Sequence, residues 1–319
     1  LRETVHGITL DDEYRWMEDP ANRDEMIAFI TQENARTRAM LDALPERAWF
    51  EQRIEEISSG LDRIGSFTQC GDLALVRRIG AGERLARLYL RDAKGERLFL
   101  DPEVVAGNEL ASFGAIEFSP DCRRISVQVS TGGAEAGRVI LFDVASGTPI
   151  GQPIERIWGE FPVSFVGNDK VLYTQMAADP GANDAMLGMT SYIAPIGGDT
   201  PVQVLGNGMM VGPENFPFVV ALEGEPFAIG IAAGARTDNE FYIASSDGLR
   251  AGKPKWRKVI SLEDKVGLAM PRGRELFALS TKENPAGAIL RHPLADDGTP
   301  GAAEAVFAGA PDRLVRGFF

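Results

Sequence analysis

The fold class of this 319-residue chain is decided by the stretch Phe118-Ser119-Pro120-Asp121-Cys122-Arg123-Arg124-Ile125-Ser126-Val127. It holds the apolar end of one strand, a tight polar turn over residues 121–124 and the alternating start of a second strand. Short apolar or alternating runs on both sides of turn residues are typical of antiparallel hairpins. The stretch therefore predicts a β-hairpin whose second strand begins near Ile125.

The same hairpin pattern recurs from about Ser66 onward. Its polar turns are Gly71-Asp72, the 121–124 turn, Gly167-Asn168-Asp169-Lys170, Glu223-Gly224-Glu225-Pro226 and Arg272-Gly273-Arg274. The second strands begin near Leu73, Ile125, Val171, Phe227 and Leu276, which gives a period of 46 to 56 residues. Four-stranded propeller blades repeat every ~40–50 residues, and loop insertions lengthen that period. A β-sandwich explains many strands but not such a period, so a propeller is favoured.

We therefore expect a mainly β fold: a partial propeller of the seven-bladed type, over residues 63–319, with about five blades plus one strand. The extra strand is the apolar run Leu314–Phe319, where the chain stops before the polar turn that follows such a strand in earlier repeats. We expect that Phe319 is not the natural C-terminus, that the chain is a fragment, and that its open blade edges favour self-association.

Residues 1–62 are expected to form an N-terminal helical arm. Asp19-Pro20 is a helix-start signal, because an acidic cap precedes proline in the first turn. Beyond it, residues recur at steps of three and four, which indicates one face of an amphipathic helix; they are Met26, Ile27, Ile30, Asn34, Thr37, Leu41 and Leu44. Pro45 interrupts this pattern. A second short helix is expected to carry Trp49, Phe50, Ile54 and Ile57 and to stop near Ser58-Ser59-Gly60.

The composition excludes several classes of function. The chain is 44% hydrophobic and 25% charged, and its formal charge of −13 disfavours binding to nucleic acid or to an anionic membrane surface. No apolar run approaches the ~20 residues of a membrane helix. The chain begins at Leu1 without a signal-peptide pattern, which leaves a cytoplasmic and a periplasmic location both open.

No residue is nominated for catalysis, for a cofactor or for a metal. No serine has glycine two residues before and two after it, as a nucleophile elbow requires. His6 and His292 lie far apart, and no Cys/His spacing resembles a zinc site. The glycines around Gly206-Asn207-Gly208 and Gly212 match no phosphate-binding motif and are expected to form a loop between the third and fourth blades. Asp11-Asp12 and Glu55-Glu56 are interpreted as solvated carboxylates, because adjacent side chains diverge.

Cys70 and Cys122 occupy equivalent positions, each three residues before a second strand, in adjacent blades. A disulfide requires Cα atoms within ~7 Å, a limit that neighbouring blades can exceed. Two free thiols are therefore favoured.

The run Asp12-Glu13-Tyr14-Arg15-Trp16-Met17-Glu18-Asp19-Pro20 resembles the N-terminal signature of the prolyl oligopeptidase family, and Gln32-Glu33-Asn34 and Thr37-Arg38 continue it. Further similar runs are Phe118–Asp121 with Ile125–Val127, Ser130–Gly133 before Phe142–Val144, and Leu276–Pro285. The resemblance covers essentially the whole chain.

The resemblance implies a serine peptidase in which the arm joins a catalytic α/β-hydrolase domain and the propeller gates access of short peptides. This chain lacks that domain's motifs, so it should be inactive alone; Trp16 is expected to pack, with the hydrolase domain as the obvious partner. Two alternatives stay open: a stand-alone propeller that binds proteins or ligands, and a propeller paired with a related non-prolyl hydrolase.

Overall fold

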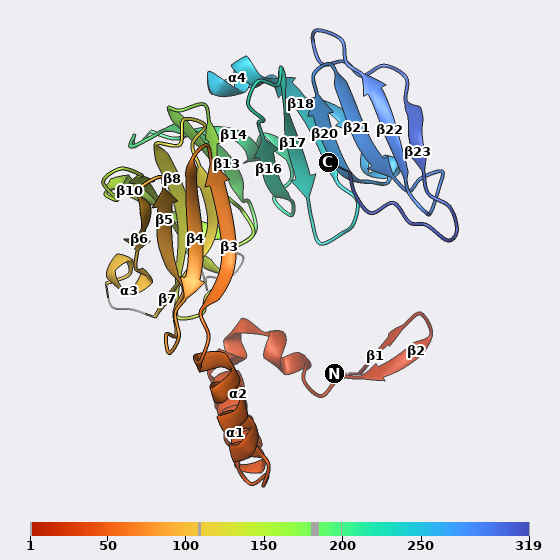
Figure 1. Cartoon of the computed structure of the whole chain (residues 1–319). Helices are drawn as coiled ribbons and strands as arrows, with labels where there is room; N and C mark the ends of the chain where they lie inside the picture. The colour runs from red at the N-terminus through yellow and green to blue at the C-terminus, as the bar shows by residue number, and fades with distance from the viewer. Residues whose placement is uncertain (1, 108–109, 180–184, 199, 319) are drawn as a thin grey trace. The chain divides into compact units, whose positions relative to one another are not determined.

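The computed structural model describes residues 2–107, 110–179, 185–198 and 200–318. The chain divides into two compact units, Leu1–Asp62 and Arg63–Phe319. Each unit is described by itself, because the positions of the parts relative to one another are not determined (Figure 1).

The first unit is mostly helical. It begins with a hairpin of β1 (Arg2–Val5) and β2 (Ile8–Asp11), which the sequence did not predict, and continues through the 3-10 turns η1 (Arg15–Glu18) and η2 (Pro20–Asn22). The long helix α1 spans Arg23–Asp42, and α2 spans Arg47–Ser59. Asp19 caps the 3-10 turn η2, since its carboxylate accepts a hydrogen bond of 2.9 Å from the Ala21 amide, and α1 itself begins four residues later than expected, at Arg23. The break at Pro45 and the stop before Gly60 are confirmed.

The second unit consists, in its described residues, of five sheets that follow one another along the chain (Figure 1). The first contains β3 (Arg63–Cys70), β4 (Leu73–Ile79), β5 (Arg87–Asp92) and β6 (Gly95–Leu100); the short helix α3 (Pro102–Val105) follows it. The second contains β7 (Ala111–Phe118), β8 (Arg124–Thr131), β9 (Ala136–Asp143) and β10 (Pro149–Trp158). The third contains β11 (Ser164–Val166), β12 (Lys170–Gln175), β13 (Thr190–Pro195), β14 (Val202–Asn207) and β15 (Met210–Val211).

The fourth sheet contains β16 (Phe216–Val220), β17 (Phe227–Ala233), β18 (Glu240–Ser245) and β19 (Arg257–Ile260), with helix α4 (Ser246–Arg250) between the last two. The turn η3 (Leu262–Asp264) leads to the fifth sheet, which contains β20 (Val266–Arg272), β21 (Glu275–Ser280), β22 (Ala288–Pro293) and β23 (Glu304–Ala308). Neighbouring strands are antiparallel throughout, apart from the parallel pair β14–β15. The five predicted second strands are confirmed as β4, β8, β12, β17 and β21, and the mainly β propeller class is confirmed with them.

The cores of this unit lie between successive sheets. On β8, Ile125, Val127 and Val129 belong to the cluster shared with the first sheet. On the neighbouring β9, Val139 and Leu141 belong to a different cluster, shared with the third sheet. Alternate side chains of a strand point to opposite faces of its sheet. Both faces of the second sheet are therefore buried, each against a different neighbour, as in the stacked blades of a propeller.

The expected strand at Leu314–Phe319 is wrong for residues 314–318, which form no strand; Phe319 lies outside the described residues. The Val315 amide donates to the Ala286 carbonyl at 2.8 Å, and the ring centroids of Phe277 and Phe318 are 6.5 Å apart. This segment therefore lies against the fifth sheet without pairing as a strand among the described residues.

The arm should exchange its amide hydrogens faster than the sheets of the second unit. No residue of α1 or α2 is buried, whereas five residues of β8 are. An amphipathic helix takes most of its stability from packing its apolar stripe, so these helices open more easily. Hydrogen exchange read by mass spectrometry, at concentrations where the chain is monomeric, measures this. Protection of residues 23–59 equal to that of 125–129 would contradict the prediction.

Candidate functional site

One feature joins successive sheets at the turns that precede their second strands. The turns of the first three sheets, residues 70–73, 119–124 and 167–170, are connected one to the next, and Arg250 of α4 continues the series into the fourth sheet. We call these three turns with Arg250 the turn chain. The three turns were singled out from the sequence, but the role of Arg250 and the contacts between the turns were not predicted.

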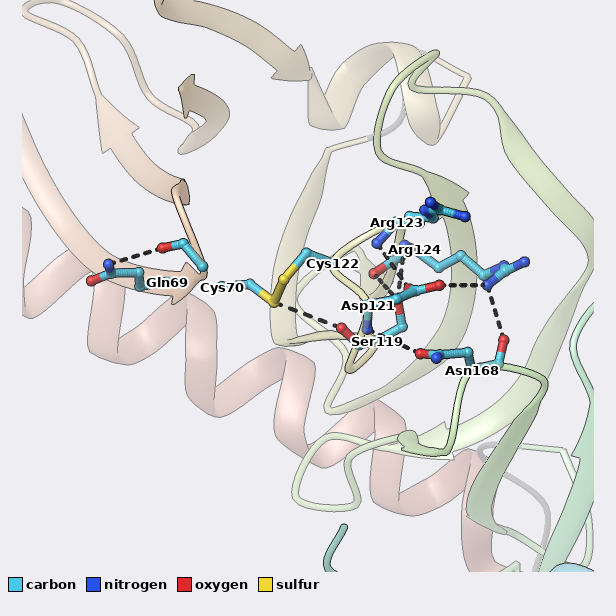
Figure 2. Close-up of a disulfide and its surroundings, with 9 residues drawn as sticks. Gln69, Cys70, Ser119, Asp121, Cys122, Arg123, Arg124 and Asn168 are labelled. Atoms are coloured by element: carbon cyan, nitrogen blue, oxygen red, sulfur yellow. Dashed lines mark hydrogen bonds and ion pairs between the residues drawn. A yellow bond between two sulfur atoms is a disulfide. The ribbon is translucent and has the colours of Figure 1, made fainter. Parts of the chain in front are cut away.

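The first connection of the turn chain is covalent (Figure 2). Cys70, at the end of β3, forms a disulfide with Cys122, and their Cα atoms are 5.7 Å apart. The expectation of two free thiols is therefore wrong. The middles of packed sheets lie ~10 Å apart, but turns at their ends can converge. Here Gly71 and Cys122 both take left-handed backbone conformations, with φ of 54° and 59°, in the two facing turns.

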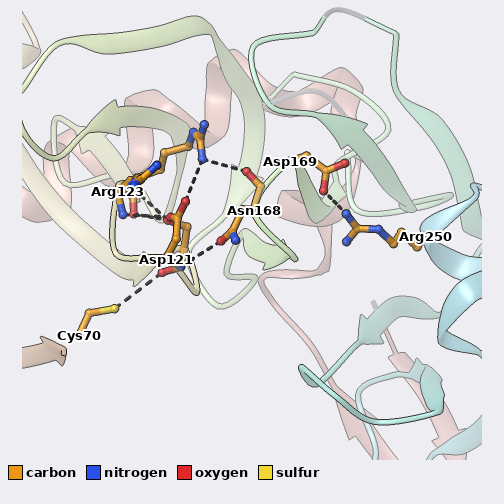
Figure 3. Close-up of polar contacts among 8 residues, drawn as sticks. Cys70, Asp121, Arg123, Asn168, Asp169 and Arg250 are labelled. Atoms are coloured by element: carbon orange, nitrogen blue, oxygen red, sulfur yellow. Dashed lines mark hydrogen bonds and ion pairs between the residues drawn. The ribbon is translucent and has the colours of Figure 1, made fainter.

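The second connection is made by hydrogen bonds (Figure 3). The Asp121 amide donates to the Asn168 side-chain oxygen at 3.0 Å, and the Arg124 guanidinium donates to the Asn168 carbonyl at 2.9 Å. Within the turn, Ser119 Oγ donates to the Asp121 carboxylate at 2.6 Å. Burial raises the pKa of that carboxyl, but its hydrogen bonds from Ser119 and Arg123 outweigh burial and hold the pKa below its ordinary value. The ionised Asp121 carboxylate thus stabilises the conformation of the turn through the hydrogen bonds it accepts from Ser119 and Arg123.

The third connection joins the third sheet to α4. The Arg250 guanidinium pairs with the Asp169 carboxylate (Figure 3). It also donates to the Val166 carbonyl at 3.1 Å, and Lys170 Nζ donates to the Arg250 carbonyl at 2.5 Å. Between the fourth and fifth sheets, the Glu225 carboxylate accepts from the Gly273 amide at 2.5 Å. Each pair of successive sheets is therefore joined by a polar or covalent contact near these turns.

A second set of contacts joins the first strand of one sheet to the sheet before it. Arg77 of β4 donates to the Gly114 carbonyl on β7. Ser126 of β8 donates to the Val163 carbonyl at 3.0 Å, and Thr174 of β12 donates to the Pro217 carbonyl on β16 at 2.7 Å. Hydrogen bonds of this kind satisfy backbone carbonyls that the stacking of sheets would otherwise bury unpaired.

Glu117 makes the corresponding contact from β7 to β11. Its two carboxylate oxygens accept hydrogen bonds from the Ser164 hydroxyl at 3.1 Å and from the Phe165 amide at 3.2 Å. Burial between the sheets raises the pKa of the Glu117 carboxyl, and these two hydrogen bonds oppose that shift without cancelling it. Glu117 is thus a titratable group inside the interface between the second and third sheets.

The two histidines lie in separate units. His6 forms the turn of the β1–β2 hairpin with Gly7, and His292 lies near the end of β22 with its Nδ1 3.3 Å from the Gly301 carbonyl oxygen. Trp16 packs edge-on against Phe29 of α1, with ring centroids 5.9 Å apart.

The remaining candidates have local structural roles. Gly206 and Asn207 end β14 and Gly208 follows in the turn before β15, so the expected loop is instead a strand end and a tight turn within the third sheet. The adjacent carboxylates contact different partners: Asp11 pairs with Arg2, whereas Asp12 pairs with Arg15. Glu55 and Glu56 are exposed on α2.

Among the described residues, no group of three or more His, Cys, Asp or Glu side chains is placed to hold a metal ion. None of the helices in the described part of the chain has both the length and the apolar character needed to cross a membrane.

Comparison with known proteins identifies the family. Residues 1–193 match the family model described as the prolyl oligopeptidase N-terminal beta-propeller domain. The chain is 23% identical over 294 residues to the prolyl endopeptidase of Elizabethkingia miricola and 22% identical to that of Elizabethkingia meningoseptica. Each alignment covers 89% of this chain but 40% of the relative, so the chain spans less than half the length of these proteins.

Solved structures give the same fold. A structure from a study of two prolyl endopeptidases matches 96% of this chain and 44% of its own, with a TM-score of 0.63 and 22% identity. Prolyl oligopeptidase B from Galerina marginata, bound to a 35mer substrate, matches 97% of this chain and 46% of its own, with a TM-score of 0.76 and 16% identity. This chain belongs to the prolyl oligopeptidase family and is the N-terminal propeller region of such a protein.

Replacing both cysteines, as Cys70→Ser with Cys122→Ser, should lower the free energy of unfolding of the second unit. The disulfide closes a loop with a sequence separation of 52 residues. Such a loop restricts the unfolded chain by roughly 4 kcal/mol in the chain-entropy model. Urea denaturation of the oxidised wild type and the double variant measures the difference. A dithiol should shift the wild-type midpoint and leave that of the double variant in place; equal shifts would contradict the prediction.

Glu117 should make stability fall with rising pH over a defined window. Its folded pKa lies above the ordinary value of 4.5, so between these two values the folded state holds more protons than the unfolded state. The free energy of unfolding therefore decreases as the pH rises through that window. Glu117→Gln should remove this dependence, and exposed Glu160→Gln is the matched control. If the wild-type and Glu117→Gln curves run parallel from pH 4 to 8, the role assigned to Glu117 is wrong.

Proposed function

We propose that this chain is the gating portion of a prolyl oligopeptidase-type serine peptidase. In this proposal it admits short peptides to a catalytic α/β-hydrolase domain that is not among its 319 residues. The observation that carries the proposal is the family match over residues 1–193 together with the stacked four- and five-stranded sheets that follow the arm. The sequence holds no Gly-x-Ser-x-Gly elbow, so the nucleophile has to come from elsewhere.

A gate must keep its opening narrow, and the contacts between sheets supply the required rigidity. Each pair of successive sheets shares an apolar core, and disulfide, hydrogen-bond and ion-pair contacts restrain their relative motion. A propeller with restrained blades excludes folded proteins from its central channel by size alone. The relative from Galerina marginata was solved with a 35mer substrate. The size limit proposed here therefore separates peptides of a few tens of residues from folded domains.

The arm supplies a surface for the hydrolase domain. Apolar side chains on α2 are exposed, among them Trp49, Phe50 and Ile54, and those on α1 include Ile27 and Ile30. A helix with such a stripe is stable when another element covers it. In the proposal, the catalytic domain covers this stripe and thereby fixes the arm.

The purified 319-residue chain should not cleave a short fluorogenic peptide that contains proline. The reason is that no serine in the sequence lies in the Gly-x-Ser-x-Gly elbow that this class of nucleophile requires. Activity that follows the chain through successive purification steps would contradict the prediction.

The gate itself is tested in the full-length protein encoded by the same gene. We expect cleavage after proline in peptides of ten to thirty residues and none in a folded protein that displays an exposed proline loop. An isolated hydrolase domain serves as the control and should cleave both. If the full-length protein lacks peptidase activity, the chain acts instead as a binding propeller.

Self-association of the isolated chain is a further expectation. Ile64 and Phe67 on β3 and Val306 and Phe307 on β23 are exposed apolar residues on the first and last sheets. Sedimentation velocity from 1 to 100 µM measures this, and Phe67→Ser with Phe307→Ser should shift the distribution toward monomer. A monomer at every concentration would contradict the expectation.

A further inference from the structure

We propose that the Cys70–Cys122 disulfide is a dithiol-sensitive switch that sets how firmly the turn chain joins the first three sheets. It is the covalent member of a series whose other connections are hydrogen bonds and ion pairs. A change of redox state therefore acts on this one connection and leaves the others chemically unchanged.

The disulfide lies where a small reductant can reach it. Both cysteines are partly exposed. Cys122 borders a groove of about 730 Å³ between the first and second sheets, which is also lined by Leu73, Leu90 and Arg97. Around the rest of the disulfide, Cys70 Sγ lies 3.7 Å from the Ser119 carbonyl oxygen (Figure 2). The groove thus reaches Cys122, one of the two half-cystines, in the folded protein.

The reaction is thiol–disulfide exchange. A thiolate of the dithiol attacks Cys122 Sγ, a mixed disulfide forms, and Cys70 leaves as a thiolate that takes up a proton. The second thiol of the reductant then closes a disulfide within the reductant and releases Cys122 as a thiol. The protein gains two electrons and two protons, and the dithiol loses the same number.

Reduction frees the two turns but not the sheets behind them. The apolar cluster between the first and second sheets is built from buried residues that include Leu88, Phe113, Ile125 and Phe142, and Cys70 packs only against its edge as a partly buried residue. Cys122, in contrast, is a non-glycine residue at φ 59°, a conformation that costs free energy unless its surroundings impose it. Once the bond is broken, this turn can relax, and with it the Asp121 amide that reaches Asn168.

The switch follows the compartment of the protein. Disulfides persist in oxidising compartments and are reduced in the cytosol. The disulfide-bonded form is accordingly expected in a secreted or periplasmic protein, and the reduced form in a cytosolic protein.

Hydrogen exchange at single-residue resolution tests the proposal on the 319-residue chain, oxidised and after treatment with dithiothreitol. On reduction, the amides of Asp121, Cys122 and Arg123 should exchange about tenfold faster or more, since local openings set their rate. At the same labelling times, strand 275–280 of the fifth sheet should stay protected. Mass analysis after thiol alkylation confirms how much disulfide was reduced.

Two variants separate the effect of breaking the disulfide from other effects of the dithiol and from loss of the Asp121–Asn168 hydrogen bond. Cys70→Ser with Cys122→Ser should match the reduced wild type with or without dithiol. Asn168→Ala removes the side-chain acceptor of the Asp121 amide and leaves the Arg124 contact with the backbone carbonyl of residue 168, so it should speed exchange at Asp121 in both redox states.

Three results would overturn the proposal: a disulfide that dithiothreitol reduces only in denaturant, turn amides with unchanged rates after reduction, or faster exchange confined to the most protected strands. The last would identify a disulfide that acts on the unfolded chain alone.

Discussion

Burial of a sheet on both faces, against two different neighbours, is the constraint on which the rest of the second unit depends. A strand of the second sheet sends Ile125 and Val127 toward the first sheet and Ser126 toward the third, where its hydroxyl reaches Val163. Two separate cores must therefore be filled by one alternating strand. This requirement explains why the strands are rich in apolar residues at successive positions, and why polar side chains within them donate to backbone carbonyls of the next sheet.

Stacked sheets resist sliding poorly if apolar contacts alone join them, because such contacts have no direction. The turn chain and the side-chain contacts near β7, β11 and β16 are directional, because hydrogen bonds, ion pairs and a disulfide require particular distances and angles, and they therefore restrain sliding of one sheet on the next. They differ in chemistry from one interface to the next: a disulfide, an amide–carboxamide pair, an arginine with a carboxylate, and a carboxylate with a backbone amide. Two of the groups between the sheets respond to different conditions: the disulfide responds to redox state, and Glu117, in the interface between the second and third sheets, responds to pH.

The two units divide the function proposed for this chain. The second unit has its own cores and carries the restrained sheets that a size filter needs. The arm has no buried residue in either helix and exposes aromatic and aliphatic side chains. In the proposed function, the catalytic domain covers these side chains and stabilises the arm.

The sequence by itself determined the five hairpin turns, the starts of the second strands, the break between the two arm helices and the end of the second helix, because local turn chemistry and periodicity specify these features. It missed the β1–β2 hairpin, whose residues are almost all exposed and show no alternation of burial. It suggested a strand at 314–318 from apolar character alone, although a strand also needs a partner edge. The Cys70–Cys122 bond and the partners of Glu117 were decided by tertiary structure only, because both depend on how two turns or strands far apart in sequence converge. Spacing along the chain fixes which positions are equivalent in successive sheets, whereas the distance between them follows from backbone conformation at Gly71 and Cys122 and from the packing of the sheets behind them.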